Sequence, residues 1–544
     1  MKSTLRALCV SVVLWAYLAI ALSVPAQDLR SQPMKVEPLL GTRIDELLEK
    51  LTRRVEALEK VPRPPMAVDP ARLLFGEGVY ELDGVVITRE LPTIRGLGPG
   101  RTTLERTQRA GPPPGPVGLR PSAANGAGEP ARGDAPARTA PFVTVSNFGS
   151  GTPWDERFAS VSQLTVDGRE SIGKFPYADA QEIARSGWCE TDGCDGIYLD
   201  GQGATVDDVR VHSFRGIGIT SRTGGLAVRR AKSYRNYVGV RLTGSDSSIA
   251  DSFIFDNRDC CGWLPASAGN VQSSQTHYYG ARVAFYNEGG QGFRSTNDTM
   301  ADAAIGYLGN THGSGSGYAV LRGVHLQHNH VRAAILRSGP VTMTGCIIQV
   351  PQQINNARFA GIIPRLPDYE GCVGLDVQAP WVSVTGGSIT LTHYHHGSWP
   401  GPFTAAEAVW LRALDWGPWA ADFCTIECPL LDADRLNGSI GIRVTGPRKG
   451  VRVNCPIGME PPRAADGSRG NDHWTHALDR VLVVEHATLR DCQFTFRGTQ
   501  QDLLTNPEKY VDLPAGWRPP GSGNAVTLIR ADTGGRLELE NRAY

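Results

Sequence analysis

The 544-residue sequence lacks an excess of charge of either sign. Its 55 Lys and Arg residues are matched by 55 Asp and Glu residues, so the formal net charge is zero at pH 7. A chain without net charge has no global field that steers it to nucleic acid or to an anionic membrane. We therefore expect no nucleic-acid partner, and any site for a polyanion must be local.

Long apolar runs are also missing after the first residues. The run from Ala7 to Val24 follows Lys2 and Arg6 and is followed at once by Pro25. This pattern is typical of a signal peptide cleaved after residue 26. A membrane anchor is the alternative, because the run has about the minimum length for a span. We expect a secreted or cell-surface protein, periplasmic if from a Gram-negative bacterium, with no transmembrane segment after cleavage.

Helical periodicity is confined to one short segment. Residues 44–61 place apolar side chains at helical spacing, and prolines at 62, 64 and 65 end the pattern. Fewer than three heptads is little for a coiled coil, although an oligomer formed through this segment is the alternative. We expect the helix to cap the open end of a sheet, since an uncovered end invites aggregation.

Large apolar residues are nearly absent from residues 107–140, which are rich in Pro, Gly, Ala and Arg. Such a segment cannot bury enough apolar surface to fold. It predicts a mobile surface insertion.

The remaining sequence repeats itself, as in "GIYLDGQGATVDDVRVHSF" and "GIGITSRTGGLAVRRAKSY". Each piece has a short alternating apolar strand, a polar or Gly turn and a second apolar strand. The first strands begin at Ile197, Ile217 and Val240, so one repeat takes roughly twenty to twenty-five residues. The unit contains no crossover helix and is too short for a four-stranded blade. It predicts one coil of a parallel β-solenoid whose inward residues stack into ladders.

Eleven cysteines, one of them within the signal segment, make disulfides available to an exported chain. We favour a short bridge between Cys189 and Cys194 and leave the remaining pairing open. We expect four cysteines and one serine to occupy the same position in successive coils, with the cysteines mostly as stacked thiols. A disulfide between Cys424 and Cys455 is a second candidate bridge. The expected stack is Cys346, Ser388, Cys424, Cys455 and Cys492.

The stretch "GVYELDGVVITRELPTIRGLGPGRTTLER" resembles the opening coil of right-handed parallel β-helix proteins of the pectate-lyase-like superfamily, and the repeats from about 141 to 540 continue the likeness. The resemblance implies an all-β, right-handed parallel β-helix (solenoid) with an N-terminal amphipathic capping helix. That superfamily includes lyases, hydrolases, epimerases, viral tailspikes and non-catalytic surface proteins, so the fold alone does not give the activity. The expected organisation is a signal peptide (1–26), helix and linker (27–66), first coils (67–106), insertion (107–140) and β-helix (141–544).

The loops that leave the second strand of four coils carry the candidate site. Loops from one corner of a solenoid stack into a wall beside a groove. Aromatic rings in that wall would give sugar rings a flat apolar face, and arginines would bind an acid group. The substrate-binding candidates are Trp263, Tyr278, Tyr279, Arg332, Arg358, Tyr369 and Trp399.

The same loops supply groups for proton transfer. Histidines titrate near neutral pH, and a carboxylate pair can act as acid and base. The catalytic candidates are His328, His330, His393, His395, Tyr394, Asp256 and Asp259. Two histidine pairs at a spacing of two share strand faces and could bind a transition metal, but the spacing does not match zinc signatures, so the metal stays unknown.

Two reactions suit such a wall. An inverting hydrolase needs two carboxylates about 6.5–9.5 Å apart. A lyase needs a base and a cation, Ca²⁺ or Arg, beside the uronate carboxylate, which makes Ca²⁺ the candidate cofactor. The motifs of polygalacturonase-like members occur here out of order. The strand "VRVHSF" lacks the Asp that pectate-lyase-like members carry before His212. The resemblance to the family's His/Tyr-using members implies that His and Tyr act as base and acid.

We therefore expect an exported protein that modifies an extracellular polysaccharide in a groove of the β-helix, by β-elimination first and hydrolysis second. The alternative is a non-catalytic surface or adhesive β-helix that binds glycans or assembles as an oligomer. An enzyme should bring these titratable groups together at the foot of the aromatic wall, whereas a structural protein should scatter them.

Overall fold

The computed structural model separates residues 1–66 from residues 67–544. It describes residues 72–107, 141–146, 159–172, 194–351, 372–392, 406–412, 423–433, 439–457, 478–497, 511–512, 525–531 and 536–542, with short gaps inside the longer ranges. The expected signal peptide and capping helix, and nearly all of the expected insertion at 107–140, lie outside the described residues.

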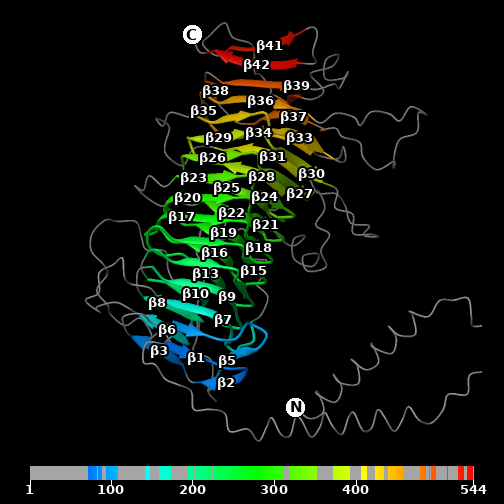
Figure 1. Ribbon diagram of the computed structural model, residues 1–544. Helices are drawn as coiled ribbons and strands as arrows, with labels where there is room; N and C mark the ends of the chain where they lie inside the picture. The colour runs from blue at the N-terminus through cyan, green and yellow to red at the C-terminus, as the bar shows by residue number, and fades with distance from the viewer. Residues whose placement is uncertain are drawn as a thin grey trace, which may run out of the picture. The chain divides into compact units, whose positions relative to one another are not determined.

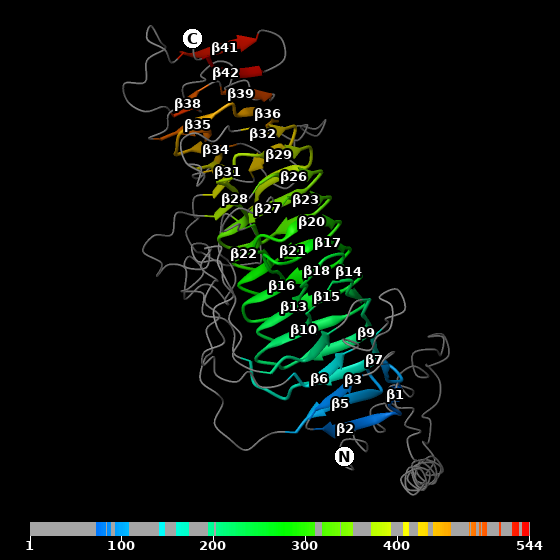
Figure 2. The ribbon, with the colours of Figure 1, turned by 90° about the vertical axis from the view of Figure 1, so that its left-hand side faces the viewer.

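The second unit is a parallel β-helix, which confirms the predicted all-β fold class (Figure 1). One coil contains β13 (Val238–Arg241), β14 (Ser248–Ala250) and β15 (Phe253–Phe255), and each of these strands pairs in parallel with its counterpart in the next coil. Figure 2 shows successive strands such as β10, β13 and β16 lying above one another. The interstrand hydrogen bonds therefore run along the long axis of the coil.

One wall of the coil is a 14-stranded sheet. Its strands are β3 (Val85–Thr88), β6 (Val143–Ser146), β8 (Ile197–Asp200), β10 (Ile217–Ser221), β13, β16 (Cys260–Leu264), β19 (Val283–Asn287), β22 (Ile305–Gly309), β25 (Arg332–Leu336), β28 (Cys372–Val377), β31 (Ala406–Leu411), β34 (Ser439–Val444), β37 (Arg480–Val484) and β40 (Val511–Asp512).

The other walls belong to one 26-stranded sheet. Its strands are β1 (Arg72–Leu74), β2 (Gly78–Leu82), β4 (Thr93–Arg95), β5 (Thr102–Arg106), β7 (Ser160–Asp167), β9 (Thr205–His212), β11 (Ala227–Arg229), β12 (Lys232–Tyr234), β14, β15, β17 (Gly269–Ser274), β18 (His277–Tyr279), β20 (Gln291–Thr296), β21 (Thr299–Ala301), β23 (Ala319–Arg322), β24 (His325–Gln327), β26 (Val341–Thr344), β27 (Ile347–Pro351), β29 (Val382–Thr385), β30 (Ser388–Thr392), β32 (Thr425–Glu427), β33 (Leu430–Ala433), β36 (Arg452–Pro456), β39 (Gln493–Arg497), β41 (Ala525–Ala531) and β42 (Arg536–Arg542). A two-stranded sheet joins β35 (Arg448–Lys449) to β38 (Leu489–Arg490).

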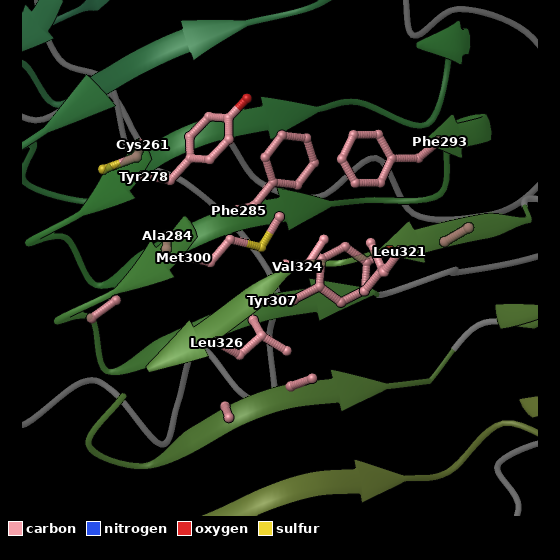
Figure 3. Close-up of a cluster of buried hydrophobic side chains, with 14 of the residues drawn as sticks. Cys261, Tyr278, Ala284, Phe285, Phe293, Met300, Tyr307, Leu321, Val324 and Leu326 are labelled. Atoms are coloured by element: carbon pink, nitrogen blue, oxygen red, sulfur yellow. The ribbon is translucent and has the colours of Figure 1, made fainter. Parts of the chain in front are cut away.

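The core lies inside the coil and is built from ladders of apolar side chains (Figure 3). The rings of Phe285 and Phe293 stack with centroids 4.3 Å apart, and Tyr307 lies 6.2 Å from Phe293 in a nearly parallel plane. Each ring comes from a different strand, so the stack ties neighbouring coils together. Such aromatic pairs contribute about 0.5–1.5 kcal/mol beyond their burial.

A repeated tight turn joins the 26-stranded sheet to the next strand of the 14-stranded sheet. Arg235, Asp256 and His328 stand at this turn with φ between 50° and 55°, and each is followed by an asparagine. Asp and His enter the left-handed region more readily than most residues. The buried asparagines stack, since Asn257 Oδ1 accepts a hydrogen bond of 3.0 Å from the backbone N–H of Asn236.

The register corrects the predicted cysteine stack. Ser388 pairs with Ile347 rather than with Cys346, and Cys455 pairs with Phe496. Cys455 is a buried free thiol, so the candidate bridge to Cys424 is absent. The spacing misled because the insertions between strands differ in length from coil to coil. The expected bridge from Cys189 to Cys194 is also absent, because Cys194 is a buried thiol that forms no disulfide.

The last described strands close the C-terminal end of the coil. β42 pairs antiparallel with β39 and with β41, in contrast to the parallel pairing of the coils. This hairpin covers a sheet edge that would otherwise be open to other chains. Within the described part of the chain, no helix is long and apolar enough to cross a membrane.

Candidate functional site

The outer face of the 14-stranded sheet changes character along the coil. In the strands from β10 to β25, the first residue and the residue three positions later point away from the core and pair with their equivalents in the next coil. In β28, β31 and β34 the second and fifth residues continue these two ladders. From β10 to β25 these outward residues are mostly apolar and form a buried cluster of their own. Its members are Ile217, Val238, Cys260, Trp263, Val283, Tyr286, Ile305, Leu308 and Ile335.

From β25 to β34 the same two ladders carry charge. Asp376 pairs with Trp410, and Trp410 pairs with Arg443. In the other ladder Arg332 pairs with Val373, which pairs with Glu407. The register therefore gathers side chains more than a hundred residues apart in sequence into one group. We call this group the Trp410 cluster: Arg332, Asp376, Glu407, Trp410, Arg412, Arg443 and Glu485.

Asp376 lies at the centre of the first half of the cluster. Arg332 Nε lies 3.3 Å and Arg412 Nη1 3.5 Å from its Oδ2, and Gln378 Nε2 donates to its Oδ1 at 3.0 Å. The Asp376 side chain is only 2% exposed. A buried carboxylate is stable only when it is paired and hydrogen-bonded, and both conditions are met here.

Glu407 and Glu485 share Arg443 in the second half. Arg443 Nη1 donates to Glu407 at 2.9 Å, and Arg443 Nη2 donates to Glu485 at 2.7 Å. Burial alone would lower the pKa of Arg443, but the hydrogen bond to Glu485 and the charge of Glu407 outweigh it, so the pKa is raised. The arginine thus keeps its positive charge between two carboxylates.

Trp410 separates these ion pairs and holds the arginines. The guanidinium carbons of Arg412, Arg443 and Arg332 lie 4.5, 5.0 and 5.4 Å from its ring centroid. Cations are attracted to the face of an indole ring, and more strongly where water is excluded. The indole Nε1–H donates to Thr445 Oγ1 at 2.7 Å, which fixes the plane of the ring.

Arg448 positions the backbone beneath the cluster. Its side chain is buried, and Nη1 donates to the carbonyl of Val377 at 3.2 Å and to that of Arg412 at 3.0 Å. These carbonyls belong to the ends of β28 and β31. One guanidinium therefore ties together the strand ends that present Asp376 and Arg412.

Among the predicted site residues, Arg332 lies in the Trp410 cluster, whereas the two described histidine candidates, His328 and His330, are not members of it. His330 is buried, and burial, followed by the charge of His328, lowers its pKa to about 3, so the ring is neutral near pH 7. His328 occupies the repeated turn, with Nδ1 3.8 Å from Asp302 Oδ1.

The two predicted aspartates face different surroundings. Asp256 is exposed at the repeated turn, where its positive φ explains the choice of residue. Asp259 is buried, with Oδ1 3.9 Å from both Arg258 Nε and Arg282 Nη1. The role of these two aspartates in proton transfer stays a prediction.

The predicted aromatic wall is not formed by its three described members. Trp263 belongs to the outer face of the 14-stranded sheet, under the guanidinium of Arg241 at 4.4 Å. Tyr278 points into the core, where burial raises its pKa, and its hydroxyl lies 2.8 Å from Ser273 Oγ. Tyr279 faces outward on the 26-stranded sheet and stacks on Phe255. Alternation along β18 sends the two tyrosines to opposite sides, which removes Tyr278 from any sugar-binding surface.

The remaining candidates lie outside the described residues and stay predictions: His393, Tyr394, His395, Arg358, Tyr369 and Trp399. The same holds for the metal site that the histidine pairs would form. Within the residues that the structure does describe, no group of three or more His, Cys, Asp or Glu side chains is placed to hold a metal ion.

Sequence reasoning missed Asp376, Glu407, Trp410 and Arg443. A signal was present, since "GLDVQ", "EAVWLR" and "GIRVT" each place a charged or aromatic residue inside an otherwise apolar strand. A charge at such a position points away from the core and is costly unless paired. The interpretation favoured loops because loops usually carry function in solenoids.

The comparisons with known proteins concern the fold. No protein-family model and no curated protein matches the sequence. Similar solved structures include the Dettilon tailspike protein (10% identity, 86% of this chain and 70% of that chain, TM-score 0.43) and the A-module of a mannuronan C-5 epimerase, AlgE6, from Azotobacter vinelandii (12%, 78% and 93%, TM-score 0.38). A third is the catalytic domain of a GH87 α-1,3-glucanase in complex with nigerose (12% identity, TM-score 0.31); 82% of this chain is covered, but only 64% of that domain. The chain is a parallel β-helix protein, as its own strand pairing shows.

Proposed function

We propose that the protein hydrolyses glycosidic bonds of a polysaccharide at the Trp410 cluster. The observation that carries the proposal is the pair of buried carboxylates, Asp376 and Glu407, held by arginines on adjacent strands beside one indole ring. Glycoside hydrolysis commonly uses two carboxyl groups, one to protonate the leaving oxygen and one to activate water. Adjacent coils of a β-helix can supply such a pair.

The ion pairs suggest the role of each group. Asp376 lies between Arg332 and Arg412, and we assign it as the carboxylate that activates water. Glu407 shares Arg443 with Glu485. We assign Glu407 as the acid that protonates the leaving oxygen.

β-Elimination is the second candidate, and the arginines favour it. Three guanidinium groups surround Trp410 and would neutralise the carboxylate of a uronate sugar, which makes the neighbouring proton easier to remove. One of the cluster carboxylates would then act as the base. Export of the protein, on which an extracellular substrate depends, rests on the predicted signal peptide.

The test measures product chemistry with matched variants. The secreted protein is incubated with neutral and uronate polysaccharides, with and without Ca²⁺, while new reducing ends and unsaturated-product absorbance are followed. We expect reducing ends without absorbance, and rates lowered about 10²- to 10⁴-fold in Asp376→Asn and Glu407→Gln. Glu427→Gln, which changes an exposed glutamate of β32, is the control.

Each other result points elsewhere. Absorbance that rises with the reducing ends moves the assignment to elimination. Full activity in both variants would show that the cluster only stabilises the fold. No product from any polymer with the wild-type protein favours the non-catalytic, glycan-binding alternative.

A further inference from the structure

Two exposed aromatic rings contact each other on neighbouring coils. Trp381, which precedes β29, is 40% exposed, and Phe423, two residues before β32, is 60% exposed. Their ring centroids lie 6.5 Å apart and their planes differ by 11°. The backbone N–H of Phe423 donates to the carbonyl of Pro380 at 2.7 Å, which fixes the two rings in register.

The fold leaves a large part of both rings uncovered. The neighbouring Val382 and Cys424 are buried, so the interior of both coils is filled without the two aromatic side chains. An aromatic side chain has 150–250 Å² of surface to bury, and 40% of Trp381 and 60% of Phe423 stay exposed to water. A ligand that covers them would bury this surface.

Next to the rings, the outer face of the 26-stranded sheet carries hydroxyl groups. Ser383 of β29 pairs with Thr342 of β26 on one side and with Thr425 of β32 on the other, and all three are partly exposed. Thr344 and Thr385 form a second, exposed pair further along the same strands. These five positions are uncharged, and a hydroxyl can both donate and accept hydrogen bonds.

We propose that this surface is a binding subsite for an uncharged segment of a saccharide chain. We call it the Trp381 platform: Trp381, Phe423, Thr342, Ser383 and Thr425. A sugar ring combines an apolar C–H face with a rim of hydroxyl groups, and the platform offers an aromatic face beside a row of hydroxyl groups. None of the five side chains is charged, so the platform itself offers no cation to an anionic polymer or a lipid headgroup; the nearest arginine in the ladder is Arg452, which pairs with Thr425.

The platform belongs to the same coils as the Trp410 cluster. Trp381 follows Gln378 by three residues in one turn, and the Gln378 side chain donates to Asp376. A chain held on the platform would therefore be anchored beside the strands that carry the cluster. The proposal deepens the proposed function and rests on it for the polymeric nature of the ligand.

Retention of the full chain in native gels tests the platform separately from catalysis. The gels contain a soluble mixed-linkage β-glucan, a soluble xylan or polygalacturonate. We expect a neutral polymer to retard the wild-type protein, and Trp381→Ala and Phe423→Ala each to weaken the apparent affinity several-fold, with about tenfold or more in the double variant. Trp381→Phe should retain most of the affinity.

Phe253→Ala is the matched control, because Phe253 is equally exposed (42%) on a different coil and stacks on His277. Thermal unfolding of each variant checks that it is folded. Retention of the double variant equal to that of the wild type would overturn the proposal, and so would the absence of retention of the wild type by both neutral polymers. A change in sedimentation alone would assign the rings to a contact between copies of the chain and would also overturn it.

Cleavage measured on the same preparations separates the two proposals. If the polymer retards the wild type but not the double variant, and the wild type cleaves no polymer, the platform is supported and the proposed hydrolysis is rejected. If the wild type cleaves the polymer and the double variant is retarded as strongly as the wild type, the platform is rejected and the proposed hydrolysis is supported.

Discussion

Asp298 is a buried acid in the middle of the core. Its Oδ1 accepts a hydrogen bond of 2.8 Å from the backbone N–H of Thr276, and its Oδ2 accepts one of 2.5 Å from Ser295 Oγ. Burial raises its pKa to about 6, although the hydrogen bonds from Ser273 and Ser295 oppose the shift. A raised pKa means that the protonated acid fits the folded protein better than the carboxylate does.

The Asp298→Asn variant should lose a defined part of the pH dependence of stability. The folded pKa exceeds the unfolded value of 3.8, so this contribution is fully present below pH 3.8 and is lost as the pH rises through 6. The loss amounts to about 3 kcal/mol. Denaturant unfolding between pH 3.5 and pH 7 should show that the variant no longer has this decline.

The exposed Asp251→Asn is the control for this measurement. His330 acts in the opposite sense, because its pKa is lowered to about 3 and its contribution is lost as the pH falls below 6.5. Because His330 is present in both proteins, its contribution cancels when the stability of the variant is compared with that of the wild type at each pH. An unchanged pH dependence in Asp298→Asn would mean that the carboxyl is ionised in the folded protein at pH 5.

Close contact between strands limits the size of the side chain that a strand position can hold. Gly239 lies in β13, and a Cβ built there would stand 2.3 Å from Ile254 Cγ2 and 2.6 Å from the carbonyl oxygen of Cys261. Both neighbours belong to packed strands, so neither can move far. The glycine therefore allows β13 to approach the opposite wall of the coil.

Gly239→Ala should destabilise the protein by about 1–3 kcal/mol, which is typical of overpacking a filled core. Equilibrium denaturant unfolding gives the free energy of unfolding of the variant. Gly100→Ala provides the matched control, since a Cβ there meets no atom within 4 Å. Equal stabilities of the two variants would show that β13 shifts freely.

The coil could be predicted from the sequence, whereas most of the candidate site could not. Short strands that alternate apolar and polar residues already imply a sheet with one buried face, and their regular repetition implies a solenoid. The site depends on which residues share a rung. Asp376 meets Trp410 only because the residues between β28 and β31 form one complete coil, and coil lengths vary with insertions. The same uncertainty in register produced the wrong cysteine stack.

For the β-helix of residues 67–544, the arrangement of coils limits how far a local change spreads. Each strand of a middle coil pairs with the coil before and the coil after it, as β20 pairs with β17 and β23. In such arrays stability is approximately a sum of unit and nearest-neighbour terms. Local opening can then occur in one group of coils while distant coils stay folded.

Phe293→Ala should therefore destabilise only part of the β-helix. Phe293 is buried in the stack with Phe285 and Tyr307, and its removal leaves a cavity worth about 3–5 kcal/mol. Hydrogen exchange followed by mass spectrometry should show faster exchange in β17 to β23 and unchanged exchange in β2 and β5. Phe496→Ala, in a distant coil, should give the complementary pattern. Uniformly faster exchange in both variants would contradict nearest-neighbour coupling.

The direction of the hydrogen bonds has a mechanical consequence. The backbone runs around the coil while the interstrand hydrogen bonds run along its axis, so a force that pulls the two ends apart loads the weak bonds and not the covalent chain. Paired residues such as Ile217 and Val238 are one coil apart, and each coil stores roughly 70 Å of chain at about 3.3 Å per residue. Under tension the β-helix should therefore lengthen in steps, as one coil after another peels from the end, and behave as an extensible tether rather than a brittle rod.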